Sequence, residues 1–298
     1  MQQWNVYKER VLDRIQLCCE KKIWPFEYTD FQCWLRNFND DKQDEIVALY
    51  LLDRLVVRTK ETAISGYSRL IASELRQSWI RNGIISNDLS ITDLMKALKS
   101  RHGLNKVAMA PVTDHTEYGD SGPSLFRHLD PIYSTKKKIS KDVQAIVYID
   151  DILGTGTQLM HFLENISPQE EFPDAKIYYA PLVAYEDKLE ESKERYPDIQ
   201  ILPVEIINDE VMPFKQNEYT EIITNFLDIS VAELWQHYLK MFDKYCGAKG
   251  YKDMWKGYGN LGLPVVFEWG CPNNVPGMLR MEESNLYPNW SQLFRGRS

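Results

Sequence analysis

One segment constrains the fold of this chain more than any other. Residues 145–149, Ala-Ile-Val-Tyr-Ile, are apolar at every position, which is typical of a central strand buried on both faces of a parallel sheet. Asp150 and Asp151 follow directly, and from Leu159 onward apolar residues recur at helical spacing. The segment therefore predicts a strand, a short loop and a helix. We expect both acids at the carboxyl end of the strand, where open α/β sheets bind ligands.

The loop between this strand and this helix carries groups suited to an anion. Gly154 and Gly156 let the backbone curl closely. Thr155, Thr157 and Gln158 add polar side chains beside the amides of a helix start, which together with the helix dipole favour a phosphate. Adjacent carboxylates suit vicinal hydroxyls or a hydrated Mg²⁺. We interpret the segment as a sugar-phosphate site; the alternative is an ordinary strand-to-helix turn with an Asp cap and glycines for curvature.

Two other phosphate-binding motifs do not fit this loop. A Walker loop is excluded because no Gly-Lys-Ser/Thr follows the glycines. A Rossmann fingerprint is a poor fit because the loop lacks G-x-G-x-x-G spacing.

Composition narrows the classes of protein that remain. The chain has 298 residues, 44% hydrophobic and 26% charged, which is ordinary for a soluble globular protein with one large domain or slightly more. A net charge of −8 argues against nucleic acid as a general partner. No apolar run approaches the roughly 18 residues of a membrane span, and the N-terminus has no signal-peptide core. Five cysteines at irregular spacing indicate reduced thiols and a cytoplasmic location.

The hydrophobic pattern changes along the chain near residue 105. Before it, the periodicity predicts helices, including one over residues 40–57 that is apolar enough to be central in a bundle. After it, strands alternate with helices, which predicts a parallel α/β sheet. The expected strands are residues 107–112, 141–150, 176–184, 199–207 and 263–269.

The strand, the two acids and the Thr-Gly-Thr loop together resemble the phosphoribosyl pyrophosphate signature of type I phosphoribosyltransferases. The resemblance covers about fifteen residues, and its parts fall in the expected order. It implies that Asp150 and Asp151 serve the ribose hydroxyls and Mg²⁺, and that residues 154–158 bind the sugar phosphate.

Features outside this signature resemble one divergent branch, the PRTase-CE family of bacterial conflict and antiphage systems. These features are an early Trp, a late strand, a Pro-Asn-Asn segment and a tail that closes on an aromatic residue and Arg. They correspond to Trp4, residues 265–267, residues 271–274, Trp290 and residues 293–295. This wider resemblance spans nearly the whole chain.

The type I resemblance also implies a second loop that binds pyrophosphate, after an earlier strand. Its candidate is the segment of residues 114–124, where Ser121, Gly122 and Ser124 could present donors at a helix start. A plain loop with a helix cap is an equally good interpretation of this segment.

The sequence departs from the type I pattern at two positions of the phosphate loop. Purine-salvage members carry an acid immediately before the Thr-Gly, where this chain has Gly154, so that base chemistry is not supported. Gln158 stands where a small hydroxyl residue is commoner, so we expect the phosphate contacts at this position to differ from those of the type I pattern.

We therefore predict an α/β fold, a mostly parallel sheet flanked by helices of the type I phosphoribosyltransferase-like kind, with a helical N-terminal region. The expected regions are a helical region at residues 1–100, a core at 101–270 and a closing tail at 271–298.

The resemblance implies a protein that binds phosphoribosyl pyrophosphate or a nucleotide with Mg²⁺ and acts at ribose C1. It also implies a bacterial antiphage effector with a protein partner from a defence system. The alternative is a non-catalytic nucleotide or sugar-phosphate sensor that binds a partner protein, because fold does not fix function.

Overall fold

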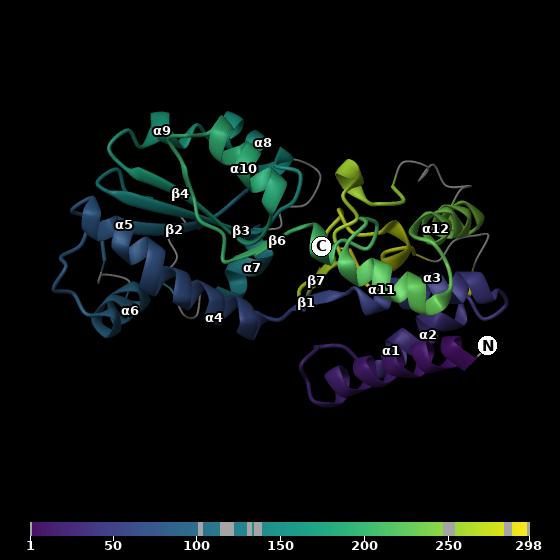
Figure 1. The fold of residues 1–298 in the computed structure, drawn as a ribbon. Coiled ribbons are helices and arrows are strands. Elements are labelled where there is room, and N and C mark those ends of the chain that lie inside the picture. The colour runs from purple at the N-terminus through teal and green to yellow at the C-terminus, as the bar shows by residue number, and fades with distance from the viewer. Residues whose placement is uncertain are drawn as a thin grey trace. The chain divides into compact units, whose positions relative to one another are not determined.

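The structure, a computed structural model, describes residues 2–100, 104–113, 122–129, 133, 139–246, 254–282 and 288–296. Packing divides the chain into two compact units (Figure 1). The first unit combines Met1–Thr59 with Asn208–Ser298, and the second is the continuous segment Lys60–Ile207. The division into regions 1–100, 101–270 and 271–298 stays a prediction.

A parallel sheet forms the centre of the second unit. Its strands are β2 (Val107–Pro111), β3 (Ala145–Leu153), β4 (Lys176–Tyr185), β5 (Gln200–Ile201) and β6 (Glu205–Ile207). The order is β2-β3-β4-β5, β6 also pairs with β4, and every pairing is parallel. The strand expected over residues 199–207 is split in two around Pro203, since proline cannot donate to a ladder. The sheet confirms the predicted fold class.

Helices cover both faces of this sheet. They are α4 (Lys60–Leu70), the π-helical segment η1 (Ile71–Leu75), α5 (Arg76–Arg81), α6 (Ile91–Lys99), α7 (Gly122–Leu129), α8 (Thr157–Ile166), α9 (Pro168–Glu171) and α10 (Glu186–Arg195). Helices α8 and α10 lie on one face, and α4, α5 and α7 lie on the other (Figure 1). Leu159 and Phe162 of α8 and Leu189 of α10 pack against Ile146 and Tyr148 in one apolar cluster. Burial of such side chains is the main force that holds helix to sheet.

The first unit is mainly helical. Its elements are α1 (Gln2–Glu20), α2 (Tyr28–Arg36), α3 (Lys42–Asp53), β1 (Val56–Arg58), η2 (Asp209–Val211), α11 (Glu218–Leu227), α12 (Val231–Cys246), η4 (Tyr258–Asn260), β7 (Val265–Phe267) and η5 (Gly277–Leu279). A reciprocal cap starts α12. Ser230 Oγ accepts from the amide of Glu233 at 3.1 Å, and Glu233 Oε2 accepts from the amide of Ser230 at 2.7 Å.

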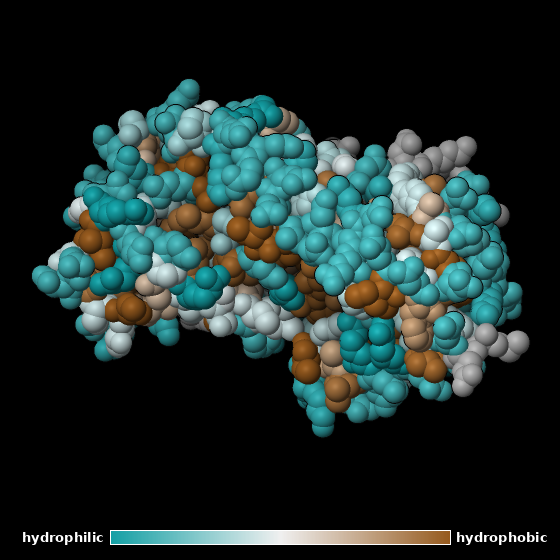
Figure 2. Space-filling view, in the orientation of Figure 1, coloured by the Kyte–Doolittle hydropathy of each residue, from teal (hydrophilic) through white to brown (hydrophobic). Residues whose placement is uncertain are grey.

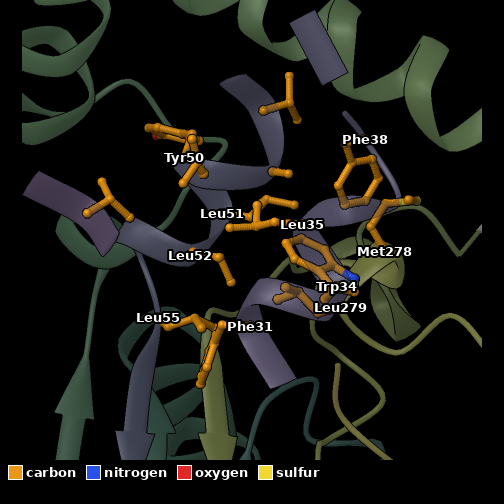
Figure 3. Packing of buried hydrophobic residues seen from close by; sticks show 14 of the residues in the cluster. Phe31, Trp34, Leu35, Phe38, Tyr50, Leu51, Leu52, Leu55, Met278 and Leu279 are labelled. Atoms are coloured by element: carbon orange, nitrogen blue, oxygen red, sulfur yellow. The ribbon is translucent and has the colours of Figure 1, made fainter. Parts of the chain in front are cut away.

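Residues from both ends of the chain share the core of the first unit. Phe31, Trp34 and Leu35 of α2 and Tyr50, Leu51 and Leu52 of α3 belong to the same cluster as Met278 and Leu279 (Figure 3). The expected Pro-Asn-Asn segment and the tail also meet, because the amide of Cys271 donates to the carbonyl of Arg295 at 3.0 Å. These late residues are thus part of the core of the first unit.

Two short strands of the first unit form a separate sheet. The helix expected over residues 40–57 ends at Asp53, and the β-branched Val56 and Val57 begin β1 instead. β1 pairs in parallel with β7, with Val56 opposite Val265. The late strand expected over residues 263–269 is therefore present, shorter than expected and outside the five-stranded sheet.

The face of the molecule in Figure 2 is mostly hydrophilic, with hydrophobic residues in scattered groups. Across the described ranges, no helix combines the length and the apolar character that a membrane crossing requires.

Candidate functional site

Both aspartates of the predicted site lie within β3 and not at its end. The strand continues to Leu153, because Ile152 and Leu153 still pair with Val183 and Ala184 of β4. The side chains of Asp150 and Asp151 are buried, each with 0% exposure. The acids are therefore enclosed, whereas the sequence suggested an open position at the strand's carboxyl end.

Hydrogen bonds fix the carboxylate of Asp150. The hydroxyl of Tyr179, on the neighbouring strand β4, donates to Asp150 Oδ2 at 2.8 Å. The amide of Asp151 donates to Oδ1 at 2.9 Å, and Gln158 Nε2 lies 3.5 Å from the same oxygen. Burial raises the pKa of Tyr179 well above its usual value, and the charge of Asp150 raises it further, so the phenol stays a donor.

A second tyrosine holds the backbone of the same strands from α4. The hydroxyl of Tyr67 lies 2.7 Å from the carbonyl oxygen of Ala180 and 3.1 Å from that of Asp150. Burial raises the pKa of Tyr67 well above its usual value, and the negative charges of Asp150 and Asp151 raise it further. Tyr67 is thus a protonated donor that links α4 to β3, the strand that carries the acids, and to its neighbour β4.

The predicted phosphate loop turns through a left-handed glycine. Gly156 has φ +79° and caps α8, whose first turn begins at Thr157. The amide of Thr157 donates to Thr155 Oγ1 at 3.3 Å, and the two threonine hydroxyls lie 3.0 Å apart. Gly154 is buried, whereas residues 155–158 are half-buried. This side of the loop, at the N-terminus of a ten-residue helix, is where an anion can approach.

The second predicted loop lies largely outside the described residues, Ser121 included. The described part begins with Gly122, which opens α7 with Pro123 in the first turn. Ser124 is buried, and its hydroxyl accepts from Arg127 Nη2 at 3.1 Å. Helix α7 packs against β2 and β3, so it belongs to the part of the fold that carries the acids.

Two carboxylates are the oxygen ligands that this site offers to a cation. Among the described residues, no group of three or more His, Cys, Asp or Glu side chains could hold a metal by itself. Mg²⁺ typically takes one or two carboxylates and completes its shell with water and substrate phosphate oxygens. The donor set therefore fits an Mg²⁺ shared with a phosphorylated ligand better than a self-contained metal site.

A second glycine-rich run has the spacing of a dinucleotide-binding motif. Residues 257–262 read Gly-Tyr-Gly-Asn-Leu-Gly, which is G-x-G-x-x-G spacing. In the structure this run leads into the strand β7 and not into a helix, and the amide of Tyr258 already donates to the carbonyl of Asn273 at 2.7 Å. It is a turn built on the Pro-Asn-Asn segment and lacks the strand–helix context of a dinucleotide site.

A buried strand with two acids, a left-handed glycine and a helix N-terminus on a parallel sheet define a phosphoribosyltransferase-like protein. The family model of PRTase-CE matches residues 31–295, and the chain therefore belongs to the PRTase-CE family. No curated protein matches the chain.

Sequence reasoning missed Tyr67 and Tyr179 as members of the site. Tyr67 is part of a regular helical stripe, and Tyr179 lies in an apolar strand, so both are typical core residues in the sequence. The only signal for Tyr179 is its place in the strand that follows the acidic one. Its contact with Asp150 depends on the register between β3 and β4, which the sequence does not specify.

Proposed function

We propose that the protein binds phosphoribosyl pyrophosphate or a nucleotide, together with Mg²⁺, at the turn between β3 and α8, and that it acts at ribose C1. The observation that carries this proposal is the juxtaposition of a held carboxylate with the start of α8: Gln158 Nε2, in the first turn of that helix, lies 3.5 Å from Asp150 Oδ1. A sugar phosphate can place its phosphate at the helix start and its ribose hydroxyls at the acids, because the two groups of the site are neighbours at the β3–α8 turn.

Each part of the turn has a distinct task in this proposal. The amides of residues 154–158 bind the sugar phosphate and fix its position. Asp150 and Asp151 accept hydrogen bonds from the ribose hydroxyls or hold Mg²⁺ through carboxylate oxygens. When bound, Mg²⁺ supplies positive charge beside the leaving group. Buried carboxylates near C1 favour the positive charge that develops on the ribose as the bond to pyrophosphate or base breaks.

The family membership supports a wider proposal about setting. We propose that the protein acts in the cytoplasm as a bacterial antiphage effector and contacts a protein from the same defence system.

Calorimetric titration with phosphoribosyl pyrophosphate, NAD and common nucleotides, each with and without Mg²⁺, tests the binding step. We expect saturable binding of at least one ligand, strengthened by Mg²⁺, and release of pyrophosphate or base from labelled ligand. Absence of binding by every ligand in the set would overturn the proposal.

The complete burial of both carboxylates favours a second candidate, a non-catalytic sensor. Enclosed acids require a rearrangement before they can contact a ligand, and such a change can be transmitted to a partner protein. The variant Ser121→Ala with Ser124→Ala separates the two candidates. An enzyme should lose turnover more than ground-state binding, because donors aimed at developing charge act mainly in the transition state. A sensor should show weaker binding of diphosphate ligands and no turnover in the wild type.

A further inference from the structure

We infer that Tyr179 is a positioning residue for the proposed ligand, acting through the carboxylate of Asp150. The inference rests on the proposed function of the β3–α8 turn. It assigns a role to a strand residue that the signature does not contain.

The geometry places the phenol on the same side of the sheet as the carboxylate. Tyr179 lies opposite Tyr148 in the register of β4 and β3, and Asp150 follows Tyr148 by two residues. Partners in register and residues two apart on a strand share a face. The phenol therefore reaches Asp150 Oδ2 from the adjacent strand, at 2.8 Å.

The contact fixes the orientation of the carboxylate. An ionised carboxylate accepts through two oxygens, which together offer about four lone-pair positions. Tyr179 donates to Oδ2, and the amide of Asp151 donates to Oδ1 at 2.9 Å. Donors on different oxygens prevent rotation of the group, so the carboxylate presents one fixed direction. Once the enclosed site has opened, a ligand therefore binds without the additional cost of ordering this side chain.

The neighbouring residue provides a matched control. Tyr178 is also buried in β4, and its hydroxyl also has a buried side-chain partner, in this case the hydroxyl of Ser78 at 3.0 Å. Its side chain points to the opposite face, as alternation along a strand requires. Tyr178→Phe and Tyr179→Phe therefore each remove one phenol oxygen from the same strand. The oxygen of Tyr179 contacts Asp150, and the oxygen of Tyr178 lies on the other face of the sheet.

The experiment is a double-mutant cycle read by calorimetric affinity for phosphoribosyl pyrophosphate with Mg²⁺. We expect Tyr179→Phe to weaken binding about tenfold or more, the scale of a hydrogen bond to a charged group. Tyr178→Phe should change it less than about twofold, since a change that shares no partner with the acids acts independently of them. In an Asp150→Asn background, Tyr179→Phe should have little further effect.

Two results would overturn the inference. One is wild-type affinity in Tyr179→Phe. The other is an equal loss from Tyr179→Phe whether or not Asp150→Asn is also present, which indicates a general structural effect. Failure of the proposed function looks different, because then the wild type itself binds none of the ligands. In that case the inference that Tyr179 positions the ligand is overturned as well. Melting temperatures of the same single and double variants still show whether Tyr179 and Asp150 are coupled in the folded protein.

Discussion

Gly156, in the turn between β3 and α8, faces Ser192 of α10, and a Cβ added to Gly156 would lie 3.4 Å from Ser192 Oγ. That distance is an ordinary van der Waals contact, so space does not forbid a side chain at this position. The backbone does, because its φ of +79° is unfavourable for residues with a Cβ. Glycine is therefore required here by the backbone conformation. The cost of that conformation to stability can be measured separately from any effect on ligand binding.

Gly156→Ala should lower the free energy of unfolding by about 1–2 kcal/mol, the cost of a left-handed conformation. Gly83→Ala is the control, since Gly83 has φ +67° and open space around its added Cβ. Urea denaturation should give similar losses for both variants. Titration with phosphoribosyl pyrophosphate should show weaker binding for Gly156→Ala alone, and equal affinity in both would remove the loop from the site.

Asp150→Asn combined with Asp151→Asn should abolish Mg²⁺-dependent stabilisation by ligand. It should also destabilise the unliganded protein by about 1–3 kcal/mol, because the buried donors that bond to the Asp150 carboxylate lose a charged acceptor. An open strand end would have implied little cost, and the burial of both side chains changes that expectation. Thermal shift with and without ligand measures both effects. Asp142→Asn, at an exposed position before β3, should change neither.

Tyr67→Phe should cost about 1–3 kcal/mol of unfolding free energy, because the carbonyls of Ala180 and Asp150 lose a buried donor. Chemical denaturation compared with Tyr258→Phe, at an exposed tyrosine, tests this. A cost no larger than that of the exposed control would mean that the hydrogen bonds of Tyr67 do not help to hold α4 to the sheet.

Glu233→Ala should destabilise the protein near neutral pH and much less in acid. The hydrogen bonds from Ser230 lower the pKa of the Glu233 carboxyl, first through the backbone amide and then through the hydroxyl. A lowered pKa in the folded state gives stability that is present above the unfolded pKa and lost as pH falls through the folded one. Melting temperatures near neutral pH and in acid below the folded pKa check the sign, with Gln236→Ala on the same helix as control. If Glu233→Ala lowers the melting temperature as much in acid as at neutral pH, the cap does not depend on an ionised Glu233.

The local part of the fold follows from the sequence, and the long-range part does not. The buried strand, the glycine loop and the helix after it are encoded by neighbouring residues, so the β3–α8 unit could be predicted. β1 could not, because Val56 and Val57 continue an apolar helical pattern and their partner strand, which includes Val265, lies far along the chain. The burial of Asp150 could not be predicted either, since it depends on β3 continuing past the acids to Leu153 and pairing there with β4.

The pairing of β1 with β7 has a consequence for how the chain folds. The five-stranded sheet and its helices come from one continuous segment, so their contacts can form as soon as Ile207 has been synthesised. The other unit needs Val265 to find Val56 across roughly two hundred intervening residues, a loop whose closure entropy is large when the intervening chain is unfolded. Prior folding of the inserted segment shortens that search. Refolding should therefore show two phases, with the segment Lys60–Ile207 protected from hydrogen exchange before the residues of β1 and β7.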